Sequence, residues 1–318
     1  MNTELASRLA LKGRVLTFTD SPDNYNYWET GCVIIEGGVI TSVGDRKSVL
    51  IPDNALIVDY GKDLILPGFV DGHAHYPQMN VIASFGAKLI DWLNNFTFPE
   101  EAKFSDRSYA SGIAKFFLSE LLRNGYTTSS VFCTTHPQSV DEFFSQADQL
   151  GLRMIAGKVL MDRNGPESLL DTAQSGYDQS RTLIDKWHRK NRSLYAITPR
   201  FAPTSTPEQL EVSGALYKEC EGVYIQSHVA ENVDEISWVA QLFPQMTSYL
   251  DVYSQFGLLG PRALYGHGIH FSNIDIEMVR DTDTSIIHCP TSNLFLGSGL
   301  FEYQKFKEAG VRVALGTD

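Results

Sequence analysis

Two histidines spaced i and i+2, His73 and His75, close an apolar stretch that begins at Leu64. Side chains alternate between the two faces of a β-strand, so both imidazoles would point to the same side. Such a pair can bind one metal ion, but a pattern this short is equally typical of ordinary loop histidines. Only partners elsewhere in the chain can decide between these two interpretations.

Four further polar residues fall near the ends of predicted strands. His228 lies in Ser-His-Val-Ala-Glu-Asn, Glu231 follows it by three residues, His267 lies in Gly-His-Gly, and Asp318 ends Leu-Gly-Thr-Asp. Taken singly, each has an ordinary explanation, because a histidine at a strand end is usually hydrogen-bonded and an aspartate after Gly-Thr is usually a turn or cap residue. Whether they form a site depends on whether the fold brings them together.

The chain after His75 alternates apolar runs with helical stretches, which is typical of parallel βα units. Ile113, Phe116, Phe117 and Leu121 recur at helical spacing and predict a helix over residues 109–122; a second helix is expected over 168–187. With the stretch that ends at His75, the predicted strands number eight, the others covering 127–132, 153–160, 194–200, 223–228, 263–267, 285–288 and 311–317. The pattern predicts an α/β fold, a TIM-type (β/α)8 barrel with its active site at the C-terminal ends of the strands.

In such a barrel the candidate histidines and carboxylates share one end. Imidazoles and one carboxylate are suitable ligands for zinc or iron. A metal with such ligands and an open position lowers the pKa of bound water to about 7. The joint placement of these residues therefore predicts a hydrolytic metal site.

Short β runs joined by turn residues occupy residues 14–63 and predict a small antiparallel sheet. We expect two domains: one over residues 1–66 that contains this sheet, and the barrel over residues 67–318. The long connection over residues 76–105 is rich in aromatic side chains, including Trp92, Phe96 and Phe98. It could cover the barrel mouth as a lid or simply pack against the barrel.

The composition narrows the range of partners. The chain has 26 basic and 38 acidic side chains, a formal net charge of −12, and we see no basic patch that would favour nucleic acid. No apolar run approaches the ~20 residues of a membrane span, and the N-terminus does not read as a secretory signal, so we expect a cytoplasmic protein that binds no membrane. The four cysteines are widely spaced and are expected to be reduced and mostly buried. A small uncharged or cationic substrate fits best.

Longer motifs surround the candidate residues. They are Pro-Gly-Phe-Val-Asp-Gly-His-Ala-His-Tyr-Pro-Gln (67–78), Trp-Leu-Asn-Asn-Phe-Thr-Phe-Pro (92–99), Gly-Lys-Val-Leu-Met-Asp (157–162), Thr-Pro-Arg-Phe (198–201), Ser-His-Val-Ala-Glu-Asn (227–232), His-Cys-Pro-Thr-Ser-Asn (288–293) and Leu-Gly-Thr-Asp (315–318). Through them, and over nearly its whole length, the chain resembles the amidohydrolase superfamily and, within it, the guanine deaminase family. His-x-His and Gly-Thr-Asp are shared across the superfamily, whereas the motifs at 92–99 and 198–201 point much more narrowly.

The resemblance implies a role for each matching residue. It implies one zinc ion per subunit, or alternatively iron(II), bound by His73, His75, His228 and Asp318. It implies three catalytic residues. His267 orients or deprotonates the attacking water, Glu231 shuttles protons to a ring nitrogen, and the third is the metal ligand Asp318. The residues expected to contact the substrate are His75, Gln78, Trp92, Arg200, Phe201, Glu231 and Asp318. A homodimer is also implied.

The resemblance implies zinc-dependent hydrolytic deamination of guanine to xanthine and ammonia in purine catabolism. Arg200 can donate a forked pair of hydrogen bonds to a carbonyl oxygen, which guanine has and adenine lacks, and Phe201 offers a face for stacking. Two alternatives stay open. One is another amidohydrolase that acts on a different purine, a pterin or a triazine; the other is a catalytically inactive binding or assembly module with the same fold.

Lys158 lies within the strand predicted over residues 153–160. Some dinuclear relatives bridge two metals with a modified lysine, but we expect one metal and a structural Lys158.

The family continues beyond the position of Asp318 with a final barrel helix and with strands that join the N-terminal sheet. The resemblance therefore implies that residues 1–66 are the N-terminal part of a small β-sandwich domain. We expect both this domain and the barrel to be incomplete, because that C-terminal part is absent from this sequence.

Overall fold

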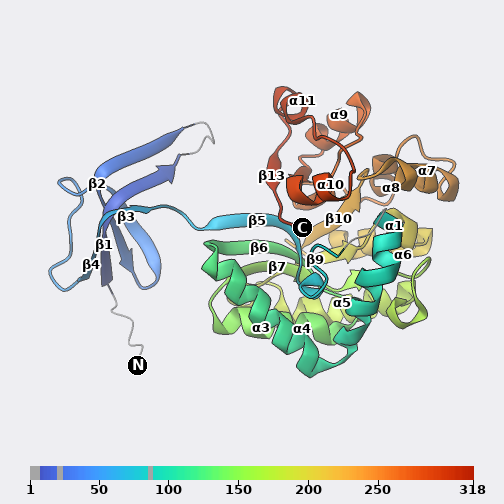
Figure 1. Ribbon diagram of the computed structural model, residues 1–318, viewed down its shortest axis with the longest axis horizontal. Helices are drawn as coiled ribbons and strands as arrows, with labels where there is room; N and C mark the ends of the chain where they lie inside the picture. The colour runs from blue at the N-terminus through green and yellow to red at the C-terminus, as the bar shows by residue number, and fades with distance from the viewer. Residues whose placement is uncertain (1–7, 20–23, 85–88) are drawn as a thin grey trace. The chain divides into compact units, whose positions relative to one another are not determined.

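A computed structural model describes residues 8–19, 24–84 and 89–318 (Figure 1). The chain divides into two compact units, Met1–Gly68 and Phe69–Asp318. Among the helices formed by the described residues, none is both long and apolar enough to cross a membrane.

The first unit is a four-stranded sheet in the order β3-β2-β1-β4. Its strands are β1 (Arg8–Phe18), β2 (Tyr25–Glu36), β3 (Val39–Asp45) and β4 (Leu56–Ile65). The pairs β1–β2 and β2–β3 are antiparallel as predicted, and Gly37 and Gly38 form the turn between β2 and β3 with positive φ angles of 56° and 80°. The prediction of a wholly antiparallel sheet is wrong at β4, which runs parallel to β1. A parallel neighbour requires a crossover rather than a tight turn, and the chain between β3 and β4 supplies it.

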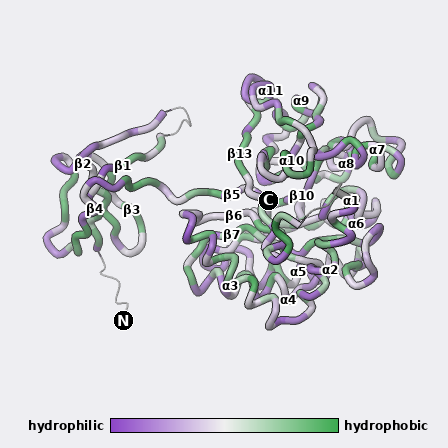
Figure 2. The backbone as a smooth tube through the Cα atoms, in the orientation of Figure 1, coloured by the Kyte–Doolittle hydropathy of each residue, from purple (hydrophilic) through white to green (hydrophobic). Residues whose placement is uncertain are grey.

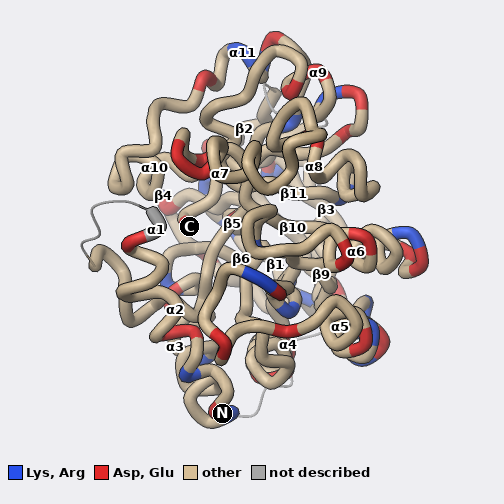
Figure 3. The backbone as a smooth tube through the Cα atoms, turned by 90° about the vertical axis from the view of Figure 1, so that its right-hand side faces the viewer, with Lys and Arg blue, Asp and Glu red and all other residues tan. Residues whose placement is uncertain are grey.

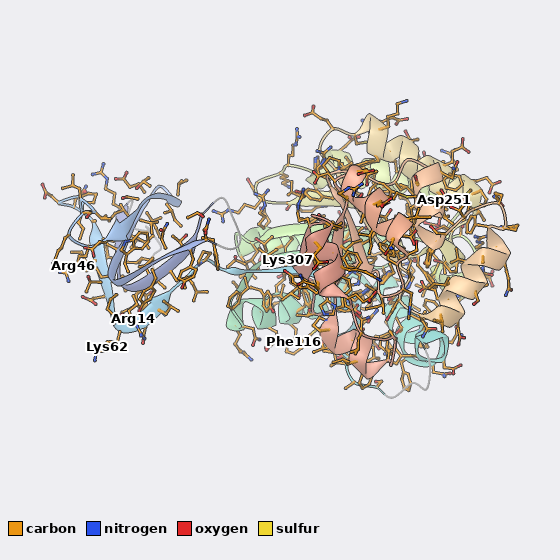
Figure 4. All side chains as sticks on the ribbon, turned by 90° about the horizontal axis from the view of Figure 1, so that it is seen from above. Arg14, Arg46, Lys62, Phe116, Asp251 and Lys307 are labelled. Atoms are coloured by element: carbon orange, nitrogen blue, oxygen red, sulfur yellow. The ribbon has the colours of Figure 1, made fainter. Side chains whose placement is uncertain are left out.

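Polar contacts on the outside of this sheet tie β1 to β4. The Nε of Arg14 donates a hydrogen bond to the backbone oxygen of Lys62 over 2.5 Å, and Figure 4 labels both residues. On the inside, the small core of this unit is formed by Ala10, Cys32 and Ile34.

The second unit is built on a parallel barrel, which confirms the predicted fold class. Its strands are β5 (Phe69–His75), β6 (Tyr126–Phe132), β7 (Arg153–Gly157), β8 (Val159–Leu160), β9 (Leu194–Pro199), β10 (Tyr224–Val229), β11 (Ala263–His267), β12 (Ser285–His288) and β13 (Val313–Leu315). They follow the order β13-β12-β11-β10-β9-β7-β6-β5, with β8 paired to β9. The first and last strands meet where the backbone N–H of Asp318 donates to the oxygen of His73 over 2.8 Å.

The apolar stretch from Leu64 to His75 is not one continuous strand. It contains the end of β4 and all of β5, separated by Leu66, Pro67 and Gly68. Proline has no N–H to donate to a sheet, so Pro67 ends the pairing of one unit before the next begins. The strand expected over residues 153–160 is likewise divided at Lys158 into β7 and β8.

Helices surround the barrel strands, and α3 and α4 lie beside β6 and β7 in Figure 1, while α5 packs against β9. The helices are α1 (Leu89–Trp92), α2 (Phe98–Glu101), α3 (Arg107–Arg123), α4 (Pro137–Gln149), α5 (Ala173–Trp187), α6 (Pro207–Glu219), α7 (Val233–Leu242), α8 (Tyr249–Gln255), α9 (Asn273–Asp281), α10 (Pro290–Phe295) and α11 (Tyr303–Glu308). The helix expected over 168–187 begins later, at Ala173, because Thr172 caps it by accepting a hydrogen bond from the N–H of Ser175.

Each longer helix turns one apolar face inward. Figure 2 shows green and purple segments alternating along the helices, and in Figure 3 the charged residues lie mainly on helices and connections such as α5, α6 and α9. In α3, Phe117 and Leu121 are buried, whereas Phe116, labelled in Figure 4, is 51% exposed. The predicted helix over residues 109–122 is confirmed by α3, and Phe116 lies outside the buried stripe of that helix.

Candidate metal centre and adjoining cavity

Four ligand atoms gather at the C-terminal ends of the barrel strands. The Nε2 of His75 lies 3.2 Å from the Nε2 of His73 and 3.0 Å from the Nε2 of His228. The Oδ1 of Asp318 lies 3.2 Å from the Nε2 of His73 and 3.3 Å from the Nε2 of His75. Ligands placed tetrahedrally around zinc at ordinary bond lengths lie about 3.3 Å apart. The four atoms therefore have the spacing of a ligand shell for one divalent metal.

A fifth residue borders the same point. Ligand atoms of His73, His228, His267 and Asp318 all lie within 4.8 Å of one another. The Nδ1 of His267 lies 2.9 Å from the side-chain amide nitrogen of Asn293, which is positioned to donate to it. The Nε2 of His267 then faces the site, 3.4 Å from Glu231 and 3.9 Å from Asp318, as a buried atom without a hydrogen-bond partner.

The strands determine where these side chains lie. His73 and His75 leave the same face of β5, His228 lies near the end of β10, and His267 ends β11. Asp71 fixes β5 beside the final segment, because its carboxylate accepts hydrogen bonds from the N–H of His73 over 3.2 Å and from the N–H and hydroxyl of Thr317 over 3.0 and 2.6 Å. This contact holds the two ends of the barrel together at the ligand shell.

Two glycines allow His73 to sit deep in the barrel. A Cβ atom on Gly266 would lie 2.7 Å from the imidazole of His73, and one on Gly316 would lie 2.8 Å from the Cβ of His73. Neither contact is tolerable, so any larger residue at these positions would displace the histidine. The glycines of Gly-His-Gly and Leu-Gly-Thr-Asp are thus part of the site.

Three non-glycine residues at this site have left-handed backbone conformations. Ala230, His267 and Asp318 have positive φ angles of 47°, 76° and 63°. Residues with a Cβ rarely adopt this region, and their presence at strand ends is typical of functional sites that the surrounding structure holds in place.

Burial and charge set the protonation states. Burial lowers the pKa of His75 to about 4 and that of His228 well below its usual range, so both rings are neutral and can bind a cation. The Nδ1 of His228 donates to the backbone oxygen of Arg200 over 2.6 Å, which leaves its Nε2 lone pair directed at the site. For Asp318, burial alone would raise the pKa, but the adjacent His73 and His75 outweigh it and hold that pKa well below its usual range.

Glu231 is a buried carboxyl at the same cavity. Burial, with a further contribution from the charge of Asp318, raises its pKa to about 8, so the carboxyl holds a proton near neutral pH. The hydroxyl of Ser298 donates to its Oε1 over 3.3 Å, while its Oε2 faces His267. A protonated carboxyl beside a metal site is the group that general acid catalysis requires.

A cavity of about 470 Å³ opens from the ligand shell. Among the residues that line it are His75, Gln78, Trp92, Arg200, Phe201, His228, Glu231, His267 and Asp318. His73 lies beneath them and is 1% exposed. The structure thus brings every candidate site residue of the sequence to one place. The connection over residues 76–105 contributes to the walls as well, through Met79, Ile82 and Leu93.

Arg200, Phe201 and Trp92 contribute donors and rings to the cavity wall. The Nη1 of Arg200 donates to the Oε2 of Glu101 over 2.6 Å, and the guanidinium lies 5.1 Å from the centre of the Phe98 ring. Phe201 is buried, 6.1 Å from the ring of Trp238. The indole N–H of Trp92 is buried and without a hydrogen-bond partner, so a ligand in the cavity is a candidate acceptor.

Lys158 is not among the described residues that line the cavity. It is fully buried, and its Nζ pairs with the carboxylate of Asp171 and donates to the backbone oxygen of Val159 over 3.2 Å. These partners are what a structural lysine requires.

Sequence reasoning missed several residues that support the site. Asp71 precedes His-x-His by two positions, which could have drawn attention to it. Glu235 accepts hydrogen bonds from the N–H groups of Glu231 and Asn232 over 3.0 and 3.3 Å and from the hydroxyl of Tyr249 over 2.8 Å. Its signal was the Asn-x-x-Glu capping box that starts α7. Glu101 and Ser298 had no signal of this kind.

Comparisons with known proteins agree with this geometry. The model of a family described as the amidohydrolase family matches residues 64–318. The guanine deaminase of Escherichia coli (strain K12) is 45% identical over 97% of this chain and 72% of that protein. A solved structure of E. coli guanine deaminase superposes with a TM-score of 0.95 over 98% of this chain and 74% of that chain. A guanine deaminase from C. acetobutylicum, solved with guanine bound in its active site, is 33% identical with a TM-score of 0.90 over 98% of this chain and 74% of that chain.

Proposed function

The chain belongs to the amidohydrolase family, and we propose that it catalyses the hydrolytic deamination of guanine to xanthine and ammonia. The observation that carries this proposal is the cavity itself, in which a His/Asp ligand shell, the acid Glu231 and the donor Arg200 face one space. The similarity to guanine deaminases over nearly the whole chain supports guanine as the substrate.

The family and the His/Asp group indicate a divalent metal. We propose one zinc ion, with iron(II) as the other metal that this ligand set accepts, held by His73, His75, His228 and Asp318. When bound there, the metal supplies Lewis acidity that makes water nucleophilic near neutral pH.

The reaction needs a proton at the ring. Water adds to the carbon that bears the amino group, and Glu231 gives its proton to the adjacent ring nitrogen. One proton of the water passes through Glu231 to the amino nitrogen, and the C–N bond breaks. The second proton, on the new hydroxyl, returns to Glu231 as the carbonyl forms, so that xanthine, ammonia and protonated Glu231 result. His267, held by Asn293 on its far nitrogen, directs its Nε2 toward Glu231 and Asp318 and orients the water between them.

Recognition of the purine falls to other residues of the cavity wall. Arg200 donates to the ring carbonyl, Gln78 bonds the ring edge, Phe201 stacks on the ring, and Trp92 closes the cavity. A buried donor directed at that carbonyl would reject adenine, because the analogue leaves the donor unpaired.

We also propose the domain organisation, the cellular location and the oligomeric state of the protein. Residues 1–66 belong to a small β-sandwich domain and residues 67–318 to the catalytic barrel. The enzyme acts in the cytoplasm as a homodimer that binds a small purine base, and the family resemblance supports this. Light scattering on the purified protein tests the dimer, which a monomeric mass would contradict.

Guanine turnover and bound metal, measured on the same purified sample, test the function. We expect stoichiometric zinc and release of xanthine and ammonia. Stoichiometric zinc with turnover of another aminated ring, but not of guanine, would favour an amidohydrolase with a different purine, pterin or triazine substrate. A protein purified without chelator that holds no metal would favour an inactive binding module.

A further inference from the structure

Glu101 lies behind the purine-binding wall and contacts both of its polar side chains. It is 1% exposed, and its Oε2 accepts the 2.6 Å hydrogen bond from Arg200 while its Oε1 accepts one from the Nε2 of Gln78 over 3.5 Å. Arg200 and Gln78 line the cavity; among the described residues that line it, Glu101 is absent. One buried carboxylate therefore orients two groups that face the ligand space.

The position of Arg200 is fixed from three directions. Glu101 binds one of its terminal nitrogens, Phe98 covers the guanidinium at 5.1 Å, and the backbone oxygen of Arg200 accepts the hydrogen bond from the ligand histidine His228. A guanidinium has five N–H donors in a rigid fork, so those that Glu101 does not use remain available to the cavity. A donor held in this way loses little freedom when a ligand binds.

The pairing also determines what the cavity can attract. Arg200 is 3% exposed, and a buried guanidinium without a partner would favour an anion. With Glu101 beside it, the pair is neutral overall, and Arg200 acts as a hydrogen-bond donor rather than as a free positive charge.

We propose that Glu101 is a positioning and specificity-determining residue, which aligns Arg200 and Gln78 on the carbonyl edge of a neutral purine and prevents Arg200 from selecting an anionic one. This inference rests on the proposed guanine deaminase function. Glu101 acts through Arg200 and Gln78 and does not take part in the chemical step.

The adjacent Glu100 provides a matched control. It is also buried on α2, but its carboxylate accepts hydrogen bonds from Asn80 over 3.0 Å and from Lys103 over 2.5 Å. Glu100→Gln removes a buried charge one residue away without touching Arg200 or Gln78. The two variants therefore separate loss of a buried carboxylate from loss of this particular contact.

Steady-state kinetics of the metal-loaded enzyme test the proposal. We expect Glu101→Gln to raise KM for guanine by about 10-fold or more, the value of one charge-assisted hydrogen bond, while kcat and metal content stay near wild type. Glu100→Gln should leave KM unchanged. Because Glu101 acts through Arg200, adding Glu101→Gln to Arg200→Lys should cost less than the product of the two single losses.

Inhibition by urate, an anionic purine with the same ring carbonyl, tests the role of charge. Urate should inhibit Glu101→Gln more strongly than wild type. Glu101→Asp, which keeps the charge but shortens the side chain, should raise KM with wild-type urate inhibition, and it serves also if the glutamine variant does not fold.

A wild-type KM in both Glu101 variants, or fully multiplicative losses in the double variant, would overturn the positioning role. Equal urate inhibition of wild type and Glu101→Gln would overturn the role of charge. If the wild type acts on another ring instead of guanine, the proposed function fails, and the same comparison on that ring still decides the role of Glu101.

Discussion

The two walls of the cavity are built in different ways. On the metal side, His73, His75 and His228 come from strands. The Nε2 of His75 lies 3.2 Å from that of His73 and 3.0 Å from that of His228. On the purine side, Gln78 and Trp92 come from the connection between β5 and α3, and Glu101 reaches Arg200 across 99 positions of sequence. The barrel itself dictates the first wall, whereas contacts between a connection and a strand end dictate the second.

This difference predicts a division of labour. A change on the metal side removes the chemistry for every substrate, because the nucleophile is lost. A change on the purine side alters which ring is used, because binding depends on donors that sit outside the ligand shell. Variants on each wall, and one outside both, test that division.

His228→Ala should have the largest effect. It removes a ligand held by the backbone oxygen of Arg200, so we expect loss of metal and a fall in turnover of at least ~1,000-fold on every ring tested. Metal analysis and an ammonia-release assay measure both. A variant that keeps stoichiometric metal would remove His228 from the ligand set.

Glu231→Gln should separate chemistry from metal binding on the same wall. The amide cannot deliver a proton, so kcat should fall by at least ~100-fold while bound metal stays at the wild-type level. Loss of metal in this variant would instead make Glu231 a ligand.

Arg200→Lys should affect only the purine wall. One ammonium cannot reproduce the forked guanidinium, so we expect kcat/KM for guanine to fall by about 10-fold to 100-fold with metal retained. Kinetics identical to wild type would remove Arg200 from substrate recognition.

Lys158→Met should leave both walls intact. It leaves the buried Asp171 carboxylate without its cationic partner, so the free energy of unfolding should fall by about 3 to 5 kcal/mol while the folded protein keeps its metal and its turnover. Lys186→Met is the matched control, because Lys186 forms an exposed pair with Asp141 worth at most about 1 kcal/mol. Urea unfolding measures both variants; lost metal without lost stability in Lys158→Met would mean that Lys158 supports the metal site.

The same contrast explains what could be predicted from the sequence. His73, His75, His228, His267 and Asp318 could be placed at one site because parallel strands bring their C-terminal ends to one edge of a barrel. Gln78, Trp92 and Arg200 were identified only through family motifs, since nothing in their spacing brings them together.

The remaining features of the site and of the fold depend on tertiary contacts that the sequence does not show. Glu101 stands in an ordinary Pro-Glu-Glu sequence, and only the folded connection shows that it, rather than Glu100, meets Arg200. The positive φ angles at Ala230 and His267 could not be predicted from the sequence either, because non-glycine residues give no signal for that conformation. The parallel pairing of β4 was missed because a strand pattern contains no information about direction.

Metal titration of the chelator-treated protein, followed by guanine turnover, tests the central claim most directly. We predict that turnover rises in proportion to added zinc and reaches its maximum at one equivalent per subunit, with xanthine and ammonia formed in equal amounts. Saturation at one equivalent with no guanine turnover, or a requirement for two equivalents, would contradict the one-metal guanine deaminase described above.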